Sequence, residues 1–150
     1  GIMSGWGRFR QLKWWRQPHI VAVFAARKWK YNEDKMMTIV RIDAEARWSD
    51  VVIHNNTLYY TGVPENLDAD AFEQTANTLA QIDAVLEKQG SNKSSILDAT
   101  IFLADKNDFA AMNKAWDAWV VAGHAPVRCT VQAGLMNPKY KVEIKIVAAV

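Results

Sequence analysis

The sequence predicts a two-layer α+β domain over residues 37–150, and three observations support this fold class. Three short β-rich segments come first. Two longer segments, with one β-rich segment between them, then carry apolar residues at helical spacing, and two more β-rich segments close the chain. The predicted element order is β-β-β-α-β-α-β-β. Both helices should cover one face of a single mixed sheet, because each has one apolar face to bury.

The first predicted strands surround a pair of asparagines. Residues 38–41 form the first expected strand, and residues 51–54 and 57–60 form the next two. Asn55 and Asn56 separate the second strand from the third. Because asparagine tolerates positive φ, this pair predicts a tight hairpin turn.

Two amphipathic helices are predicted, over residues 70–89 and 108–122. Gly90 and Gly123 follow them, and glycine commonly ends a helix. Each helix has an apolar stripe that should face the sheet. The stripes consist of Phe72, Ala76, Leu79, Ile82 and Leu86 in the first helix, and of Phe109, Met112, Trp116, Trp119 and Val120 in the second.

The remaining strands are predicted at residues 95–103, 127–133 and 141–150. In the last of them, apolar residues alternate with charged ones, so one face of the strand is apolar and the other is polar. The sheet face away from the helices is expected to remain partly apolar. A two-layer domain with such a face tends to self-associate.

Residues 1–36 differ in composition from the rest. They carry eight Lys/Arg and two acids, a charge of +6, whereas residues 37–150 carry ten Lys/Arg and fourteen acids, a charge of −4. Their basic and aromatic residues suit a nucleic acid or a membrane surface, and an Arg-rich, acid-poor start is also typical of transit peptides. The composition changes at Met36 and Met37, where an ordinary domain begins. We therefore expect residues 1–36 to be a non-native or dispensable leader.

The composition also limits cofactors and partners. A single cysteine cannot form an internal disulfide, which fits a reducing compartment and a cytoplasmic location. The three histidines are scattered and no Cys/His spacing resembles a zinc site, so no metal is expected. The apolar run over residues 20–26 is too short to cross a bilayer. The acidic balance of residues 37–150 disfavours nucleic acid as a partner.

Arg128 is the most informative single residue. It lies in an apolar, β-rich run that begins at Pro126. Its guanidinium stays charged, so it needs water or an anionic partner, and its planar fork suits a carboxylate. Two interpretations are open: an ion pair within the sheet, for example with Glu143, or binding of a ligand carboxylate. The sequence does not fix the strand register that would decide between them.

Several other residues could act with Arg128. Asn113 lies on or beside the apolar stripe of the second helix, where an amide should have a specific partner. A bond to nearby backbone is the simpler interpretation. Glu143 could order a water molecule or move a proton, although acids within strands are usually solvated or paired. Thr61 and Gly62 could offer a hydroxyl and an accessible backbone, or could simply form a turn.

Trp48 and Cys129 complete the candidates. Trp48 could form one wall of a pocket, but a tryptophan before a strand is more often part of the core. Cys129 is expected on the side of its strand opposite Arg128, with no histidine nearby, so we interpret it as structural.

Four segments together resemble the Rid family of reactive-intermediate deaminases, also called the YjgF or RutC-like family. They are Tyr60-Thr61-Gly62-Val63-Pro64, Asn107-Asp108-Phe109 with Met112-Asn113, Pro126-Val127-Arg128, and Lys141-Val142-Glu143-Ile144. The resemblance covers residues 37–150 and excludes residues 1–36. It implies a chorismate-mutase-like α+β fold and a homotrimer whose sites lie in clefts between subunits.

The resemblance also implies roles for individual residues. Arg128 would bind the substrate carboxylate, and Glu143 would help water to attack. The family has Ser-Gly, tyrosine and cysteine at three positions where this chain has Thr61-Gly62, Trp48 and Thr130, and these differences indicate a sister subgroup. The implied substrate-binding set is Arg128, Asn113, Thr61, Gly62, Trp48 and Thr130.

The implied chemistry is the hydrolysis of short-lived enamines and imines, such as 2-aminoacrylate, to 2-keto acids and ammonia. Fixing a carboxylate, positioning water and moving a proton would suffice, so no metal or organic cofactor is expected. A non-catalytic trimer that binds small carboxylates or regulates a partner would carry the same arginine. RNA binding or cleavage is a third alternative, favoured only by the basic residues 1–36.

Overall fold

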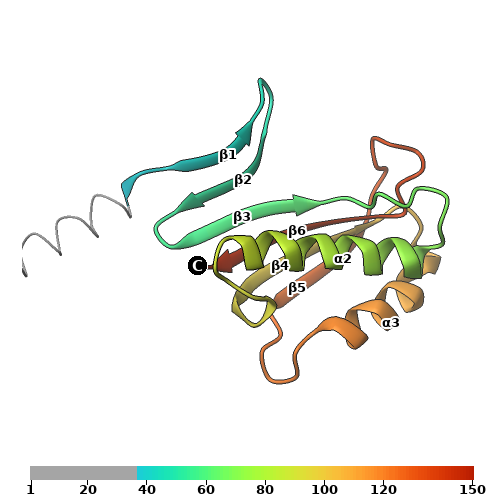
Figure 1. The fold of residues 1–150 in the computed structure, drawn as a ribbon. Helices are drawn as coiled ribbons and strands as arrows, with labels where there is room; N and C mark the ends of the chain where they lie inside the picture. The colour runs from blue at the N-terminus through green and yellow to red at the C-terminus, as the bar shows by residue number, and fades with distance from the viewer. Residues whose placement is uncertain (1–36) are drawn as a thin grey trace, which may run out of the picture. The chain divides into compact units, whose positions relative to one another are not determined.

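The computed structural model of the chain describes residues 37–150, and from Ile39 onward they form one compact unit. The expectation that residues 1–36 are a leader concerns a part of the chain outside the described residues. Within residues 37–150 the strands and helices follow the predicted order β-β-β-α-β-α-β-β (Figure 1). Two short 3-10 turns, η3 (Lys93–Ser95) and η4 (Lys106–Asp108), are added to it.

Six strands form one mixed sheet in the order β1-β2-β3-β6-β4-β5. All neighbouring pairs are antiparallel except β4 and β5, which run parallel. The last strand in the sequence, β6, therefore lies in the middle of the sheet, between β3 and β4. The strand bounds are β1 Val40–Ala44, β2 Ser49–His54, β3 Thr57–Gly62, β4 Ile96–Leu103, β5 Val127–Gln132 and β6 Val142–Ala149.

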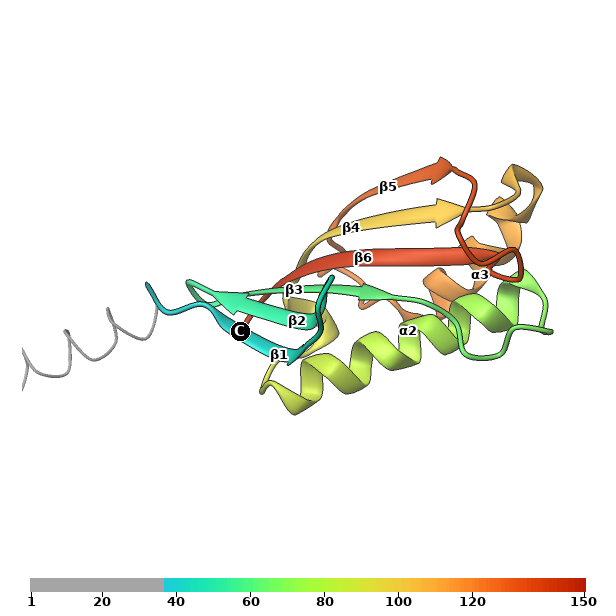
Figure 2. The ribbon, with the colours of Figure 1, turned by 90° about the horizontal axis from the view of Figure 1, so that it is seen from above.

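Two helices, α2 (Ala71–Lys88) and α3 (Phe109–Trp119), cover one face of the sheet, as Figure 2 shows. The Oδ1 atom of Asp70 caps α2 by accepting the backbone N–H of Glu73 at 2.9 Å. The second helix ends at Trp119 and not at residue 122 as predicted, because Val120 takes an extended conformation with ψ of 144°. Valine is β-branched, which favours extended backbone over continuation of a helix.

The asparagine hairpin is confirmed. Asn55 and Asn56 have φ values of 51° and 56°, in the left-handed region that a tight two-residue turn requires. The strands that the turn connects pair from His54 opposite Thr57 to Val51 opposite Tyr60. The turn thus sets the register of β2 against β3.

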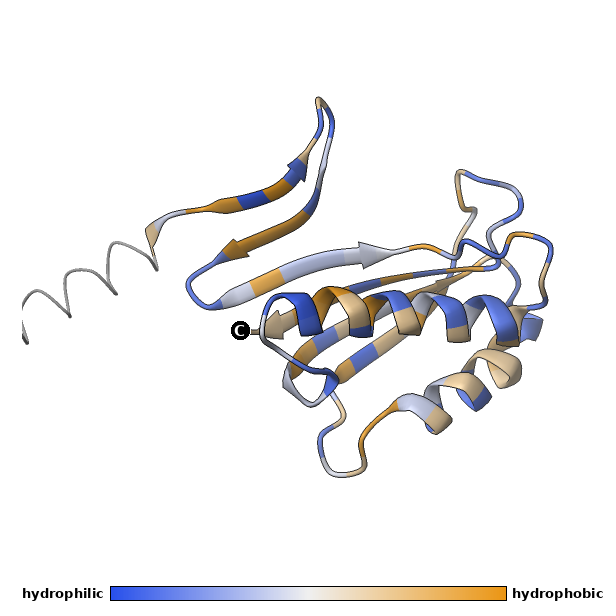
Figure 3. Ribbon diagram, in the orientation of Figure 1, coloured by the Kyte–Doolittle hydropathy of each residue, from blue (hydrophilic) through white to orange (hydrophobic). Residues whose placement is uncertain are grey.

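The core lies between the helices and the sheet. Along β6 every second side chain is fully buried, and these are Val142, Ile144, Ile146 and Ala148. Figure 3 shows the matching pattern on α2, where hydrophobic and hydrophilic residues alternate along the helix. Since successive side chains of a strand point to opposite faces, Glu143, Lys145 and Val147 lie on the face away from the helices.

The sheet face opposite the helices, called here the free face, is uncovered in the part of the chain that the structure describes. It carries apolar side chains, as predicted. Tyr59 and Val131 are each 43% exposed and Val127 is 70% exposed. Cys129 lies between the two valines on β5 and is also exposed, on the side opposite Arg128.

Candidate active site

Arg128 on β5 points toward the helix layer and is held there by two residues of α3. Its Nη1 atom donates a hydrogen bond of 2.9 Å to Oδ1 of Asn113. Its guanidinium lies 5.2 Å from the centre of the Trp116 ring, a cation–π geometry. Trp116 is 5% exposed, so it forms a firm base for the charged group. The amide of Asn113 therefore has the specific partner that its position requires, and that partner is Arg128.

The Arg128 guanidinium has no carboxylate partner among residues 37–150. The one ion pair found there joins Lys139 Nζ to Asp68 Oδ1 at 3.3 Å. Arg128 and Glu143 lie on strands that β4 separates, and on opposite faces of the sheet. The ion pair between them that the sequence left open is therefore absent. Most of the guanidinium N–H groups remain available to another anion.

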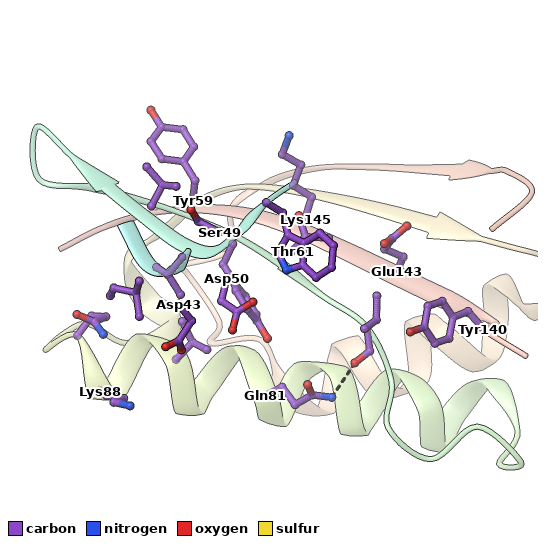
Figure 4. A pocket seen from close by; sticks show the side chains of 18 of the residues that line it. Asp43, Ser49, Asp50, Tyr59, Thr61, Gln81, Lys88, Tyr140, Glu143 and Lys145 are labelled. Carbon is purple, nitrogen blue, oxygen red and sulfur yellow. Dashed lines mark hydrogen bonds between the residues drawn. The ribbon is translucent and has the colours of Figure 1, made fainter. Parts of the chain in front are cut away.

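Glu143 lines a cleft of about 970 Å³ where β2 leaves the sheet. β2 pairs with β3 only as far as Tyr60, whereas β6 stays paired with β3 up to Gly62. The edge of β3 beyond Tyr60 thus faces the cleft. Figure 4 shows Thr61, Tyr140 and Glu143 around it. Within the described residues, the Glu143 carboxylate has no hydrogen bond and no ion pair.

Aromatic and basic side chains also line this cleft, together with the acids Asp43 and Asp50 and with residues of α2 such as Gln81. Trp48, 62% exposed, stands just before β2 and lines the cleft, so it does not belong to the core. Lys145 lies two residues beyond Glu143 on the same face of β6. Tyr60 also contributes, and its pKa lies above the usual value because the hydroxyl is partly buried and the carboxylates of Asp50 and Glu65 are near. Tyr60 therefore remains a neutral phenol at physiological pH.

Gly62 has a packing role that the sequence did not reveal. The residue is buried, and a Cβ atom built on it would lie 3.1 Å from Cγ2 of Thr78 and 3.6 Å from Cγ1 of Ile82, both on α2. The glycine therefore lets α2 approach β3 closely. This approach brings the helix against the end of β3 that borders the cleft.

Thr130 lies two residues after Arg128 and faces the same way, toward a second, smaller hollow of about 340 Å³. Its hydroxyl oxygen is buried and, among the described residues, has no hydrogen-bond partner. Asn107 and Phe109 line the same hollow. Phe109 was expected in the buried stripe of the second helix but is 47% exposed, because it is the first residue of α3 and lies at the edge of the layer.

The site residues predicted from the sequence thus fall into two groups on opposite faces of the sheet. One group, called here the arginine group, contains Arg128, Asn113 and Thr130 on the helix side. The other, called the glutamate group, contains Glu143, Thr61 and Trp48 around the cleft. The sequence missed the support that Trp116 gives to Arg128 and the presence of Tyr140 in the cleft. Cation–π stacking has no sequence signature, and Tyr140 lies in a loop whose path the sequence leaves open.

No cluster of three or more His, Cys, Asp or Glu side chains able to hold a metal ion occurs within residues 37–150. The same residues include no helix long and apolar enough to cross a membrane. The two groups themselves offer the cation of Arg128, the carboxylate of Glu143 and neutral hydroxyl and amide groups.

Comparison with known proteins identifies the family. Residues 38–150 match the family described as Endoribonuclease L-PSP. The chain is 54% identical over 114 residues to a RutC family protein of Haemophilus influenzae, an alignment that covers 75% of this chain and 98% of that protein. A protein of known crystal structure from Salmonella typhimurium is 92% identical in sequence and superposes with a TM-score of 0.72. The superposition covers 76% of this chain and 99% of the Salmonella chain. The chain therefore belongs to this family, which is the Rid or YjgF family, and its α+β fold is the chorismate-mutase-like fold.

A relative with a named activity is more distant. The chain is 30% identical over 82 residues to the 2-iminobutanoate/2-iminopropanoate deaminase of Escherichia coli. That alignment covers 53% of this chain and 64% of the deaminase.

Proposed function

We propose that the protein is a hydrolytic deaminase of reactive enamines and imines, of the 2-aminoacrylate type, which it converts to 2-keto acids and ammonia. The observation that carries the proposal is the arrangement of Arg128. A guanidinium that is stacked on Trp116 and bonded to Asn113, with no acid of residues 37–150 paired with it, is prepared for the carboxylate of a small ligand. The family and the name of the Escherichia coli relative support the choice of substrate.

The proposed reaction needs only a positioned water molecule and a group that moves protons. An enamine first takes a proton from solvent on carbon, which gives an iminium ion with a C=NH₂⁺ bond. Glu143 accepts a proton from water as the water oxygen bonds to the iminium carbon, and the electron pair of the C=N π bond moves to nitrogen, which leaves a neutral carbinolamine. Glu143 then gives this proton to nitrogen, so that the leaving group is ammonia. As the C–N bond breaks, the hydroxyl oxygen forms the C=O double bond and passes its proton to Glu143, which releases it to solvent; the products are the 2-keto acid and ammonia.

The separation of the two groups supports a site shared between subunits of a homotrimer. Arg128 and Glu143 lie on opposite faces within one chain, so one substrate cannot contact both of them in the same chain. The apolar free face, with Tyr59, Val127 and Val131 exposed, offers a surface for a second copy. In the proposed trimer the arginine group of one subunit and the glutamate group of its neighbour form each site.

The decisive experiment is a direct assay of the full chain. Imines would be generated in the cuvette from several amino acids by an amino-acid oxidase, and release of ammonia and 2-keto acid would be followed with and without the protein. We expect hydrolysis faster than the spontaneous reaction for at least one small imine. No acceleration with any of them would contradict the deaminase proposal.

A non-catalytic protein that binds small carboxylates is the second candidate. Thr130 is the observation that favours it, because a threonine occupies the position at which the best-known deaminases carry a cysteine. A chain that binds 2-keto acids through Arg128 and accelerates no imine hydrolysis would support this alternative. RNA is a weaker candidate, since residues 37–150 carry ten basic against fourteen acidic residues.

A further inference from the structure

Gln74 of α2 has a fully buried side-chain amide that bonds to the main chain of two segments, one just before α2 and one just before β6. Its Nε2 atom donates to the carbonyls of Leu67 at 3.2 Å, Ala69 at 3.3 Å and Lys139 at 3.0 Å. Its Oε1 atom accepts the backbone N–H of Lys141 at 2.8 Å. A buried side chain with partners for every polar atom holds those partners in a defined arrangement.

The bonds to Lys139 and Lys141 hold the segment that enters β6. Within this segment, residues 137–141, Oδ1 of Asn137 accepts the N–H of Lys139 at 2.9 Å, and the carbonyl of Asn137 accepts the N–H of Tyr140 at 3.0 Å. The carbonyl of Lys141 accepts the N–H of Ala104 at 3.1 Å, just beyond β4. Lys141 is thus tied to α2 by its nitrogen and to the end of β4 by its oxygen.

The segment determines where two residues of the cleft lie. Tyr140 and Glu143 both line the cleft, and Figure 4 shows both side chains there. Lys141 and Val142 lie between them in the sequence. Val142 is fully buried and is the first residue of β6. A shift at Lys141 would therefore move the Tyr140 ring and the start of the strand that carries Glu143.

We propose that Gln74 is a positioning residue for the cleft, and that through Lys139 and Lys141 it keeps Tyr140 and Glu143 in working geometry. This inference rests on the proposed function for its catalytic consequence. Gln74 is fully buried within the helix layer and acts only through main chain. The remaining polar partners of the segment, such as the exposed Lys139–Asp68 pair, lie at the surface, where an ion pair contributes little.

The test compares two substitutions of neighbouring buried residues in the full chain. Gln74→Met keeps the length of the side chain and removes all four hydrogen bonds. Thr75→Val is the matched control, because Thr75 is also fully buried and its hydroxyl bonds only to the Ala71 carbonyl of the same helix, at 2.7 Å. Both variants would be compared with the wild type by melting temperature, imine turnover and amide hydrogen exchange.

Gln74→Met should lower kcat for imine hydrolysis by about ten- to a hundredfold per folded molecule, the cost of a small misplacement at a reacting centre, while KM changes little. Amide hydrogens over residues 139–143 should exchange faster. Thr75→Val should lower the melting temperature and leave both kcat and this exchange unchanged. A folded Gln74→Met variant with unchanged kcat, or with unchanged exchange over residues 139–143, would overturn the proposal.

A second variant approaches the same segment from the surface. Asn137→Ala removes the side-chain bond to Lys139 without a buried defect, so it should fold even if Gln74→Met does not. It should lower kcat in the same direction and by a smaller factor; an unchanged kcat together with faster exchange over residues 139–143 would contradict the positioning role. A wild-type chain that hydrolyses no imine would refute the proposed function. The exchange measurements would still decide whether Gln74 holds the segment.

Discussion

At the scale of single residues, Arg128 has the most demanding chemistry, because its charge must be satisfied. The sheet could have supplied an acid, and the sequence allowed Glu143 to be that acid. The structure supplies instead an amide oxygen and an aromatic face, which orient the guanidinium without neutralising it. The charge remains available, which is the property that a carboxylate-binding site needs.

Substitution of Arg128 should separate binding from stability. Arg128→Ala should abolish imine turnover and weaken binding of a 2-keto acid by about 1.5–3 kcal/mol, or about ten- to a hundredfold. Arg128→Lys should restore little, because an ammonium cannot reproduce the two-pronged geometry. Titration calorimetry and the imine assay measure these effects. Arg41→Ala, at an exposed arginine of β1, is the matched control and should change neither. Unchanged turnover in a folded Arg128→Ala variant would contradict the proposed role of Arg128 in imine hydrolysis.

Substitution of Glu143 should lower turnover without weakening the binding of a 2-keto acid. Glu143→Gln keeps the size of the side chain but cannot accept a proton, so turnover should fall by about 10²–10⁴-fold while 2-keto acid affinity remains near that of the wild type. Glu45→Gln, at an exposed acid after β1, should retain full turnover. Equal losses of affinity and turnover in Glu143→Gln would point to a binding role for Glu143 and not to proton transfer.

At the scale of elements, local patterns predicted most of the fold. The second half of the α2 stripe, the asparagine turn and the alternation in β6 each depend on neighbours in the sequence, so each could be predicted. In the first half of α2, Phe72 and Ala76 are only half-buried, and the polar Gln74, Thr75 and Thr78 are buried there, which an apolar pattern does not reveal. The strand order could not, because the pairing of β6 with both β3 and β4 joins segments far apart in the chain. For the same reason the sequence could not show that Arg128 and Glu143 lie on opposite faces.

The contact between α2 and β3 at Gly62 can be tested by adding one methyl group. Gly62→Ala would place a Cβ 3.1 Å from Thr78 Cγ2 and should destabilise the fold by about 1–3 kcal/mol, the usual cost of overpacking. Gly134→Ala is the control, since a Cβ there would meet nothing within 4 Å. Chemical denaturation of both variants measures the difference. Equal stabilities would show that α2 can shift away from the strand.

At the scale of the whole molecule, the apolar free face and the divided site both support a homotrimer. Light scattering or sedimentation at micromolar concentration should give a mass of three chains. Phe102 lies on the free face, because its neighbours Ile101 and Leu103 on β4 are buried on the helix side. Phe102→Glu should yield folded, inactive monomers, because burial of an unpaired charge in an interface is unfavourable. Ala84→Glu, on the exposed side of α2, should leave the trimer intact. A fully active monomer, whether of the wild type or of Phe102→Glu, would rule out sites shared between subunits.

The role of residues 1–36 can be decided by removing them. The described residues from Ile39 onward form one compact unit, and the family match begins at residue 38. A chain that starts at Met37 should therefore keep the melting temperature, the oligomeric mass and the imine turnover of the full chain. Loss of turnover in a truncated chain that is still folded and trimeric would assign these residues a part in the activity.

The central place of β6 has a consequence for biosynthesis. This strand is the last of the six to be synthesised, yet it joins β3 to β4 in the middle of the sheet. The nascent chain therefore carries two incomplete sheet halves, each with an unpaired edge, until Val142–Ala149 has left the ribosome. We expect the domain to fold only after synthesis of that strand, and translational pausing just before it to expose the chain to aggregation or chaperone binding.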